Sequence, residues 1–399
     1  IWHFLKECDN HGWIQREYKP MPWCPRCGTS LSEHEMTGSY KNITHNSVFF
    51  KLPIIGTNSK ILVWTTTPWT LSSNVALAVN PEIDYVEVKV KSDEKTLILA
   101  KNAIKYLGDD KQEVLRMFKG AELVGKNFDT CFPEFEAQAK VEHKIVAWED
   151  VDAEEGTGVV HIAPGCGVED NELGKRLGLP EVMPVDDMGI ILPGFGFMSG
   201  KNTSDVAEAV FEELEKRNKL YKVMPYEHSY PVCWRCKEEL IYRLVPSWFI
   251  ATEELKPRLI KAANSVKWEP EANGKRMLDW LNNMGDWNIS RKRYYGMPLP
   301  FYPCDCGHVT VIGSKAELRE KAVDPDQVDA LPELHRPWID EVEIKCPKCG
   351  KNVKRITDVG DVWLDAGIVP FSTTGYFTDK EEWKKNYPAE WIVEMRAQV

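Results

Sequence analysis

The stretch Ile61-Leu62-Val63-Trp64-Thr65-Thr66-Thr67-Pro68-Trp69-Thr70 changes abruptly from apolar to hydroxyl-bearing side chains. The β-branched and aromatic residues before Thr65 are typical of a buried strand, and Pro68 ends such a strand because it has no N–H to donate. The threonines would then stand at the strand end, where their hydroxyl groups and free backbone N–H groups can line a polar pocket. An exposed strand edge would give the same pattern, so the residues alone leave both interpretations open.

The chain around this stretch, from about residue 46 to 225, is rich in short predicted strands. The segments 85–90 and 96–99 are β-branched runs bounded by turn-forming residues, and 156–161 indicates a glycine turn that enters a buried strand. Residues 204–220 place apolar side chains on one helical face, with Ser204 as a candidate cap. The sequence therefore predicts a mixture of strands and helices.

Two polar residues follow the glycine turn. His161 lies at the predicted end of the strand, and Asp170 comes nine residues later, beyond a glycine-containing segment. A hydrogen-bonded histidine at a strand end explains His161 without chemistry, and Asp170 could simply cap the next helix. Taken singly, neither residue establishes a site.

Eight of the 11 cysteines fall in close pairs, namely Cys24 and Cys27, Cys233 and Cys236, Cys304 and Cys306, and Cys346 and Cys349. Two thiolates from one tight turn can grip a tetrahedral ion, and four thiolates without histidine favour structural zinc. Gly28, Gly307 and Gly350 follow three pairs, where a turn needs positive φ. We expect two zinc sites, although some pairs could bind nothing. The remaining Cys8, Cys131 and Cys166 are expected to be buried thiols.

Composition excludes some classes of protein. The 399 residues carry a net charge of −11, which argues against a protein that coats nucleic acid. No apolar run approaches the roughly 20 residues of a membrane helix, and the first residues lack the pattern of a signal peptide. Because the chain starts and stops within structured patterns, we expect a fragment of a longer protein. We also expect it to be monomeric and cytoplasmic, without membrane contact.

The two polar segments together resemble a known enzyme family. WTTTPWTL at 64–71 and GTGVVHIAPGCGVED at 156–170 are similar to the editing domain of isoleucyl-, valyl- and leucyl-tRNA synthetases, with His161 resembling the isoleucyl branch. The resemblance extends to 22–29, 234–236 with 246–249, 287–296 and 361–367. Departures are modest, namely Tyr295, Leu364 and Ala366 in place of more usual residues.

The resemblance implies an architecture. The fold class would be α/β with α+β character: a barrel-like editing domain on a zinc-ribbon stalk, plus an incomplete Rossmann-type catalytic remnant. Cys24 and Cys27 would share a zinc with Cys233 and Cys236, which makes the strand-rich segment an insertion whose ends meet. The expected parts are a stalk with the first knuckle at 1–45, the editing domain at 46–225, a return stalk at 226–300, a zinc ribbon at 301–357 and catalytic-domain residues at 358–399.

The resemblance also implies a hydrolytic site made of Thr65, Thr66, Thr67, Thr70, His161 and Asp170. Asp170 would bind the free α-ammonium of a misattached amino acid. Thr66 and Thr67 would position the terminal adenosine and the attacking water, and His161 would shape the pocket or contact ribose hydroxyls. Trp69 would wall this pocket or belong to the core, and Trp363 would wall the isoleucine pocket of the whole enzyme. The basic run 291–293 could face tRNA or ATP, or be an ordinary solvated segment.

The implied activity is hydrolysis of Val-tRNA(Ile), with the 3′ end of that tRNA as partner. A hydrophobic pocket separates isoleucine from valine by only about 1–3 kcal/mol, for which isoleucyl-tRNA synthetases are the established example. The whole enzyme would use ATP and Mg²⁺ to join isoleucine to tRNA. No His-x-Gly-His or Lys-Met-Ser-Lys-Ser motif occurs here, so we expect no synthetic activity.

Two other functions remain open from the sequence. A valyl-type editing insertion would clear Thr-tRNA(Val), although His161 argues against it. A non-catalytic zinc-ribbon module that binds RNA or protein would explain the cysteine pairs, but it would not explain the threonine run or the spacing of His161 and Asp170.

Overall fold

The computed structural model describes residues 1–31, 33–36 and 38–391, and the chain divides into two compact units. The inserted unit is Lys19–Val245, and the base unit consists of Ile1–Tyr18 and Pro246–Val399. The sequence of the inserted unit thus interrupts that of the base unit. The predicted segment 46–225 lies within the inserted unit, while the finer division into five parts stays a prediction.

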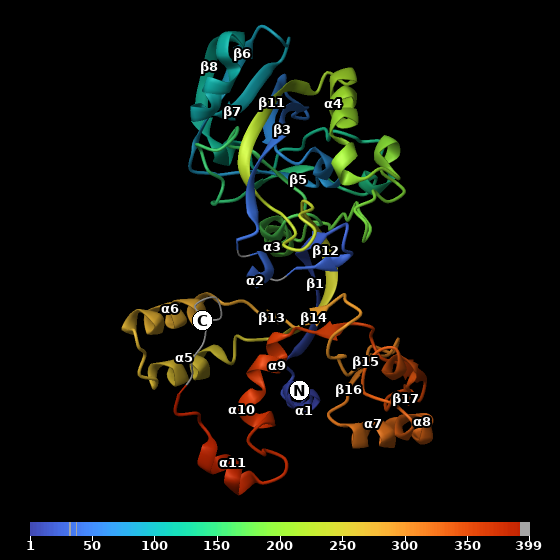
Figure 1. Cartoon of the computed structure of the whole chain (residues 1–399). Helices are drawn as coiled ribbons and strands as arrows, with labels where there is room; N and C mark the ends of the chain where they lie inside the picture. The colour runs from blue at the N-terminus through green and yellow to red at the C-terminus, as the bar shows by residue number, and fades with distance from the viewer. Residues whose placement is uncertain (32, 37, 392–399) are drawn as a thin grey trace. The chain divides into compact units, whose positions relative to one another are not determined.

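The largest sheet of the inserted unit has six strands in the order β11-β3-β4-β7-β6-β8 (Figure 1). Strand β4 is buried on both faces, apart from half-buried Trp64, and pairs antiparallel with β3 and parallel with β7. Such continuous burial explains its run of apolar residues. The strands are β3 (Tyr40–Pro53), β4 (Ser59–Thr65), β6 (Asp84–Val90), β7 (Thr96–Ala100), β8 (Lys111–Lys119) and β11 (Leu220–Pro231).

This sheet is open, so the expected barrel-like shape is wrong. Strands β8 and β11 form its two edges. On β8, which pairs with a neighbouring strand on one side, Leu115 and Met117 keep 49% and 56% of their surface exposed. The mixed α/β character of the fold is confirmed.

A second sheet of the inserted unit has the order β10-β5-β9, and β10 pairs antiparallel with β5. Helix α4 packs against β3 and β11 (Figure 1). Further elements of this unit are β2 (Thr29–Ser30), α2 (Glu33–Met36), η1 (Pro68–Ser73), β5 (Ala76–Val79), η2 (Lys101–Asp110), η3 (Gly120–Glu122), η4 (Glu136–Gln138), β9 (Lys144–Ala147), β10 (Val160–Ile162), α3 (Val168–Leu177), η5 (Gly196–Met198), η6 (Thr203–Asp205) and α4 (Ala207–Lys216).

Two helix starts differ from the sequence-based expectations. Helix α4 begins at Ala207 with Val206 as its N-cap, and Ser204 lies in the separate 3₁₀ turn η6, where its N–H donates to the Asn202 side chain. Helix α3 has Gly167 as its N-cap, so Asp170 lies inside the first turn. The carboxylate of Asp170 is thereby free for a tertiary contact.

The base unit combines short helices with short antiparallel strand pairs. Helices α5 and α6 pack against each other (Figure 1). The paired strands are β14 (Ser290–Arg291) with β19 (Val359–Gly360), β15 (Phe301–Pro303) with β16 (Val309–Val311), and β17 (Glu343–Lys345) with β18 (Asn352–Lys354). The Rossmann-type interpretation of 358–399 stays a prediction, and residues 392–399 lie outside the described part.

The helices of the base unit are α1 (Trp2–Asn10), α5 (Lys256–Asn264), α6 (Glu271–Asn283), α7 (Lys315–Lys321), α8 (Pro325–Asp329), η7 (Trp338–Glu341), α9 (Trp363–Gly367), α10 (Val369–Ser372) and α11 (Lys380–Asn386). A four-stranded sheet has the order β13-β12-β1-β2. Its strands β1 (Ile14–Cys24) and β12 (Ile241–Ile250) each contain a boundary between the units, and β13 is Trp287–Asn288.

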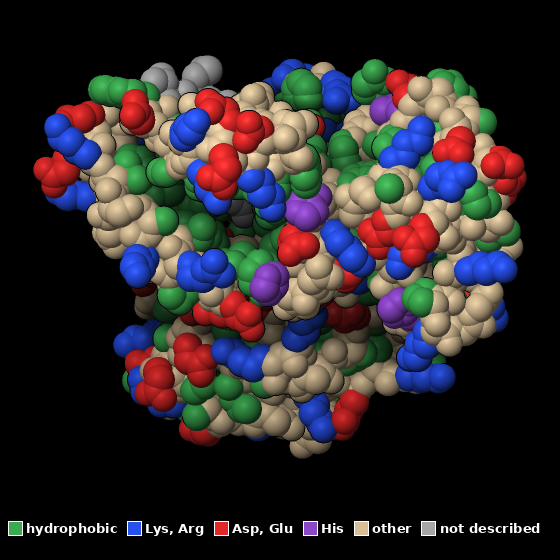
Figure 2. Space-filling view, turned by 90° about the horizontal axis from the view of Figure 1, so that it is seen from below, with side chains coloured by type: hydrophobic (Ala, Val, Ile, Leu, Met, Phe, Trp, Pro, Cys, Tyr) green, Lys and Arg blue, Asp and Glu red, His purple; other side chains and the backbone are tan. Residues whose placement is uncertain are grey.

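The surface carries charges of both signs. Lysine and arginine side chains are interspersed with aspartate and glutamate over the face shown in Figure 2. That face is therefore mixed rather than basic, in keeping with the net charge of −11. Within the described residues, no helix combines the length and the apolar character needed to cross a bilayer.

Candidate functional site

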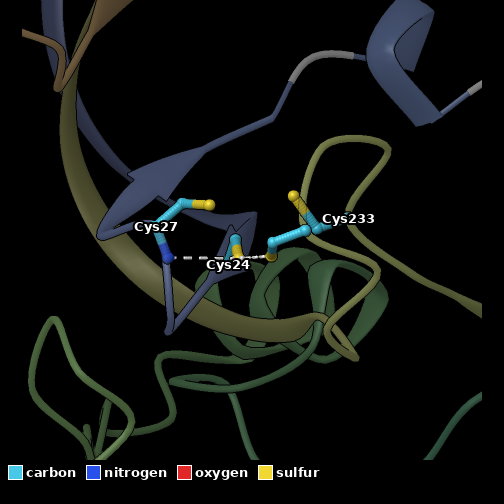
Figure 3. A group of neighbouring side chains, drawn as sticks. Cys24, Cys27 and Cys233 are labelled. Atoms are coloured by element: carbon cyan, nitrogen blue, oxygen red, sulfur yellow. Dashed lines mark hydrogen bonds between the residues drawn. The ribbon is translucent and has the colours of Figure 1, made fainter.

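The predicted cysteine pairs meet in two groups of four. Cys24, Cys27, Cys233 and Cys236 form the first group, in the inserted unit (Figure 3), and Cys304, Cys306, Cys346 and Cys349 form the second, in the base unit. Within each group all sulfur atoms lie within 4.8 Å of one another, and the Sγ atoms of Cys24 and Cys236 are 3.4 Å apart. A tetrahedron of Zn–S bonds spaces its sulfurs by about 3.8 Å. Both groups fit zinc, and the pairing of distant knuckles is confirmed.

Tight turns hold each knuckle. Gly28, Gly307 and Gly350 have φ values of +62°, +83° and +73°, and each donates its N–H to the carbonyl of the first cysteine of its pair at 2.9 Å. In the fourth pair Lys237 takes the same place with φ +66°. The backbone N–H of Cys27 also donates to Cys24 Sγ at 3.3 Å, a contact within the turn itself.

The other three cysteines are buried thiols, as predicted. Cys8, Cys131 and Cys166 expose 1%, 0% and 8% of their surface. Burial raises the pKa of each thiol to about 12, so all three stay protonated at neutral pH.

The threonine run joins His161 in one hydrogen-bond network. Strand β4 ends at Thr65, and Pro68 starts η1, which turns the chain back on itself. Thr67 N–H donates to Thr65 Oγ1 at 3.2 Å, and Thr67 Oγ1 lies 3.3 Å from Thr70 Oγ1. Thr70 Oγ1 in turn lies 2.9 Å from His161 Nε2. Half-buried Thr66 sits between these residues, outside the hydrogen bonds of the network.

Two glycines fix the strand that carries His161. Gly158 has φ +66°, and a Cβ atom there would lie 2.4 Å from the Cβ of Ala100. Gly156 has φ +54°, and a Cβ atom there would lie 2.6 Å from the ring of Trp64. Tyr85 donates its hydroxyl to the carbonyl of Gly158 at 2.6 Å. Strand β10 can therefore lie this close to the main sheet only because these positions have no side chain.

The hydrogen bonds assign the tautomer of His161. The Thr70 hydroxyl donates to the carbonyl of Thr67 at 2.8 Å, so its oxygen accepts from His161 Nε2–H. His161 Nδ1 is then an acceptor, buried and without a hydrogen-bond partner among the described residues. Burial lowers the pKa of His161 to about 4. The ring is neutral at physiological pH and offers one unused lone pair.

Asp170 is a half-buried carboxylate near the same strand end. Its Oδ2 accepts from the backbone N–H of Ala163, two residues beyond His161, at 2.8 Å. Gly167 makes room for it, because a Cβ there would lie 3.0 Å from Asp170 Oδ2. Desolvation raises the pKa of Asp170 to about 6, against the lowering effect of the Ala163 hydrogen bond. The carboxylate is mostly ionised at pH 7, and a cation would stabilise it.

The two predicted tryptophans lie in different units. Trp69 is 8% exposed and belongs to the hydrophobic core of the inserted unit. Trp363 starts α9 in the base unit, where its N–H donates to Asp361 Oδ1 at 3.1 Å. The roles predicted for both in substrate binding stay predictions.

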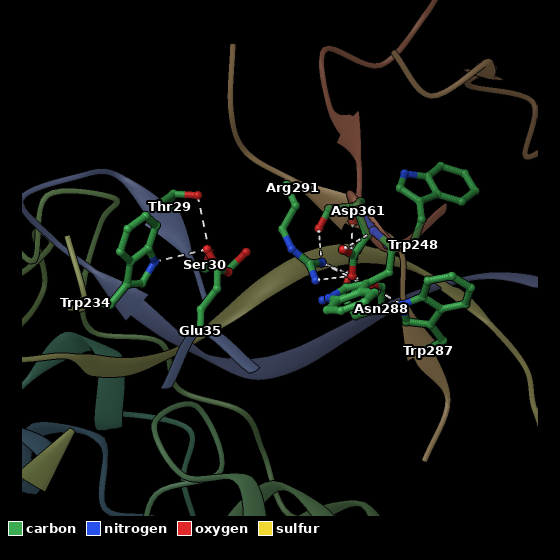
Figure 4. A network of polar contacts seen from close by, with 11 residues as sticks. Thr29, Ser30, Glu35, Trp234, Trp248, Trp287, Asn288, Arg291 and Asp361 are labelled. Atoms are coloured by element: carbon green, nitrogen blue, oxygen red, sulfur yellow. Dashed lines mark hydrogen bonds and ion pairs between the residues drawn. The ribbon is translucent and has the colours of Figure 1, made fainter. Parts of the chain in front are cut away.

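The basic run 291–293 is partly internal. Arg291 Nη2 pairs with Asp361 Oδ2 at 2.6 Å, and both side chains are only 6% exposed (Figure 4). Lys292 pairs with Asp358 at 2.8 Å. Arg291 thus joins two of the quoted motifs, 287–296 and 361–367, and is unavailable to a phosphate in this arrangement.

The whole chain matches one family of enzymes. The model for the class I tRNA synthetases (I, L, M and V) covers residues 1–398. The chain belongs to this family. It is 39% identical over 398 residues to the isoleucine–tRNA ligase of Clostridium tetani. The alignment covers 99% of this chain and 38% of that protein. The isoleucine–tRNA ligase of Pyrococcus horikoshii is 40% identical over 433 residues, and this alignment covers 100% of this chain and 40% of that protein.

The chain thus spans about two fifths of the length of these curated relatives. Among solved structures, the editing domain of the P. knowlesi cytosolic leucyl-tRNA synthetase aligns with a TM-score of 0.32 and 12% identity, over 50% of this chain and 100% of that one. The crystal structure of GlLeuRS-CP1 aligns with a TM-score of 0.37 and 13% identity, over 44% of this chain and 96% of that one.

Sequence reasoning missed several residues that shape the site. Gly158 and Gly167 matter through the missing Cβ, and Asn171 donates to the carbonyl of Pro164 at 3.0 Å and so fastens the turn before α3. The available signal was the density of glycine and proline between 156 and 167. That density indicates a turn, but not which atoms approach each other across it.

Proposed function

We propose that this chain carries the editing site of an isoleucine-type synthetase and hydrolyses the ester bond of Val-tRNA(Ile). The observation that supports it most is the network Thr67–Thr70–His161, with the Asp170 carboxylate held two residues beyond that histidine. The partner would be the aminoacylated 3′ end of the tRNA, in the cytoplasm, with the chain acting as a monomer. The proposal concerns hydrolysis alone, without ATP.

Asp170 would bind the α-ammonium group of the attached amino acid. Among the described residues its carboxylate accepts one hydrogen bond, from Ala163, and burial raises its pKa because the ionised form is partly removed from water. An ammonium ion would supply both the charge and the missing donors. A substrate whose amino group is already acylated should therefore bind poorly.

His161 would accept a hydrogen bond from the substrate rather than carry a proton. Its buried Nδ1 has no hydrogen-bond partner among the residues that the structure describes, and a ribose hydroxyl could donate to it. With a pKa of about 4, the ring is a weak base. The Thr65 and Thr67 hydroxyls would position the water that attacks the ester carbon, while the ribose oxygen leaves and takes up a proton.

The selectivity would come from size. A second pocket that admits valine and excludes isoleucine corrects what a synthetic site cannot separate by about 1–3 kcal/mol, again the established example of this family. Zinc at the two cysteine groups would be structural, since four thiolates leave no open position for water.

Deacylation of charged tRNA tests the proposal. The chain should release valine from Val-tRNA(Ile) much faster than buffer does, and it should spare Ile-tRNA(Ile). Preference for Thr-tRNA(Val) would instead indicate a valyl-type insertion. If the chain binds zinc but hydrolyses neither substrate, the result would favour a non-catalytic zinc-ribbon module that binds RNA or protein.

A further inference from the structure

The linking segment, which we define as residues 178–202 between α3 and η6, touches the turn that positions Asp170. Gly165 approaches it so closely that a Cβ there would lie 2.1 Å from the carbonyl oxygen of Val182. Asn171 donates to Glu181 Oε1 at 2.8 Å and to the carbonyl of Pro164 at 3.0 Å. A shift of the segment would therefore shift the turn 163–167 and the carboxylate bonded to it.

The same linking segment touches the first cysteine group. Trp23 donates its indole N–H to the carbonyl of Asp187 at 2.8 Å. A Cβ on Gly189 would lie 3.0 Å from the Cβ of Pro25, which stands between Cys24 and Cys27 in the knuckle. The turn of the linking segment is thus packed on the metal-binding turn itself.

Arg243 closes this contact from the neighbouring strand β12. Its side chain is 8% exposed, and its guanidinium lies 4.9 Å from the centre of the Trp23 ring. It pairs with the Asp187 carboxylate, and its Nη2 reaches Met183 Sδ at 4.0 Å. Ion pairing and cation–π contact from one buried cation favour a single position of the segment. We call Trp23, Asp187 and Arg243 the clasp.

We propose that the clasp transmits zinc occupancy of Cys24, Cys27, Cys233 and Cys236 to the position of Asp170, so that Asp187 and Arg243 are positioning residues for editing. The inference rests on the proposed function. Without metal, four thiol groups have no reason to stay within contact distance, and the Trp23–Pro25 turn loses its anchor. The linking segment would then loosen at one end, and the Asp170 turn at the other.

Hydrogen–deuterium exchange tests the coupling independently of activity. Cys236→Ser removes one ligand of the first group, and Cys349→Ser is its matched control in the second group. Each should lower the zinc content of the full chain. Only Cys236→Ser should speed exchange in 182–190 and 161–173, by more than about tenfold. Unchanged exchange in Cys236→Ser, or equal acceleration in both variants, would overturn the proposal.

A second pair of variants keeps the metal in place. Arg243→Gln should retain both zinc ions, speed exchange in the same two peptides, and lower kcat/KM for Val-tRNA(Ile) by at least about tenfold. Arg243→Lys should restore part of the loss. Arg116→Gln is the control, since Arg116 also combines an ion pair, with Glu87, and a ring contact, with Phe118, on strands β6 and β8 outside the linking segment.

The outcomes separate the two proposals. Absence of hydrolysis by the unaltered chain would refute the proposed function, while the exchange experiment would still decide whether the zinc turn and the Asp170 turn are coupled. Normal exchange and normal kcat/KM in Arg243→Gln would refute the clasp even if the chain proved to be an efficient hydrolase.

Discussion

Burial acts on Asp170 and His161 in the sense expected for each charge. Loss of solvent raises the pKa of the Asp170 carboxyl to about 6 and lowers that of the His161 imidazole to about 4. At neutral pH these residues therefore present a carboxylate bonded to the Ala163 N–H and a neutral ring whose Nδ1 has no hydrogen-bond partner in the described part of the chain. This pair suits a substrate that offers an ammonium and a hydroxyl.

The pH profile of hydrolysis should show which group matters. Asp170 is ionised above its pKa, so kcat/KM for Val-tRNA(Ile) should fall as the pH drops through about 6. The profile of kcat/KM reports the free enzyme and is the quantity to measure. His161→Ala, as control, should lower activity yet keep this acid limb. A limb that survives in Asp170→Asn would contradict the assignment.

Asp170→Asn should separate activity from stability. The amide can still accept from Ala163, but it loses the charge for the ammonium, so kcat/KM should fall roughly a hundredfold, or about 3 kcal/mol. The folded-state pKa lies above the ordinary value, so the cost of the ionised carboxylate to stability is largest above about pH 6 and shrinks as the pH falls from there toward 3.8. Removing the charge should stabilise the fold by about 1–2 kcal/mol at pH 8. Thermal unfolding checks this, and a lowered Tm would contradict it.

At the scale of elements, much of the candidate site could be predicted from the sequence. The run 61–67 predicted a strand ended by Pro68, and β4 confirms it because apolar β-branched residues with a terminal proline have few alternatives. The start of α4 could not be predicted, since the hydrogen bond that the Ser204 N–H donates to the Asn202 side chain involves a residue outside the helical pattern. The close approach of β10 to the main sheet could not be predicted either, because a glycine in the sequence does not indicate which residue packs against it.

Gly158→Ala should measure how tightly β10 must pack. The new Cβ would meet both a positive φ and Ala100 at 2.4 Å, so the free energy of unfolding should fall by about 2–4 kcal/mol. Gly125 is the control, since it has φ +85° but nothing within 4 Å of its Cβ position. Gly125→Ala should cost only about 1 kcal/mol. Equal losses in urea unfolding would show that backbone strain, not crowding, constrains the strand.

At the scale of the whole molecule, the two cysteine groups belong to separate units. Metal analysis of the purified chain should give two zinc ions per chain, and Cys349→Ser should leave about one. Each unit then depends on its own ion, so a chelator should destabilise both. One zinc ion in the unaltered chain would show that one group binds no metal.

The chain spans about two fifths of its relatives, yet the proposed chemistry lies within the inserted unit. The pairing of Cys24 and Cys27 with Cys233 and Cys236 predicted that insertion from the sequence. The openness of the main sheet was beyond prediction, because alternating strands are equally compatible with a closed barrel. The net charge of −11 further predicts weak binding to tRNA, since few phosphates are neutralised.

The most direct measurement is the rate at which this chain releases valine from Val-tRNA(Ile), compared with isoleucine from Ile-tRNA(Ile) and with Asp170→Asn. The expected result is rapid loss of valine, preservation of the isoleucyl ester, and near-background rates in Asp170→Asn. Valine release no faster than in buffer, or undiminished in Asp170→Asn, would contradict the assignment of these residues to an editing site.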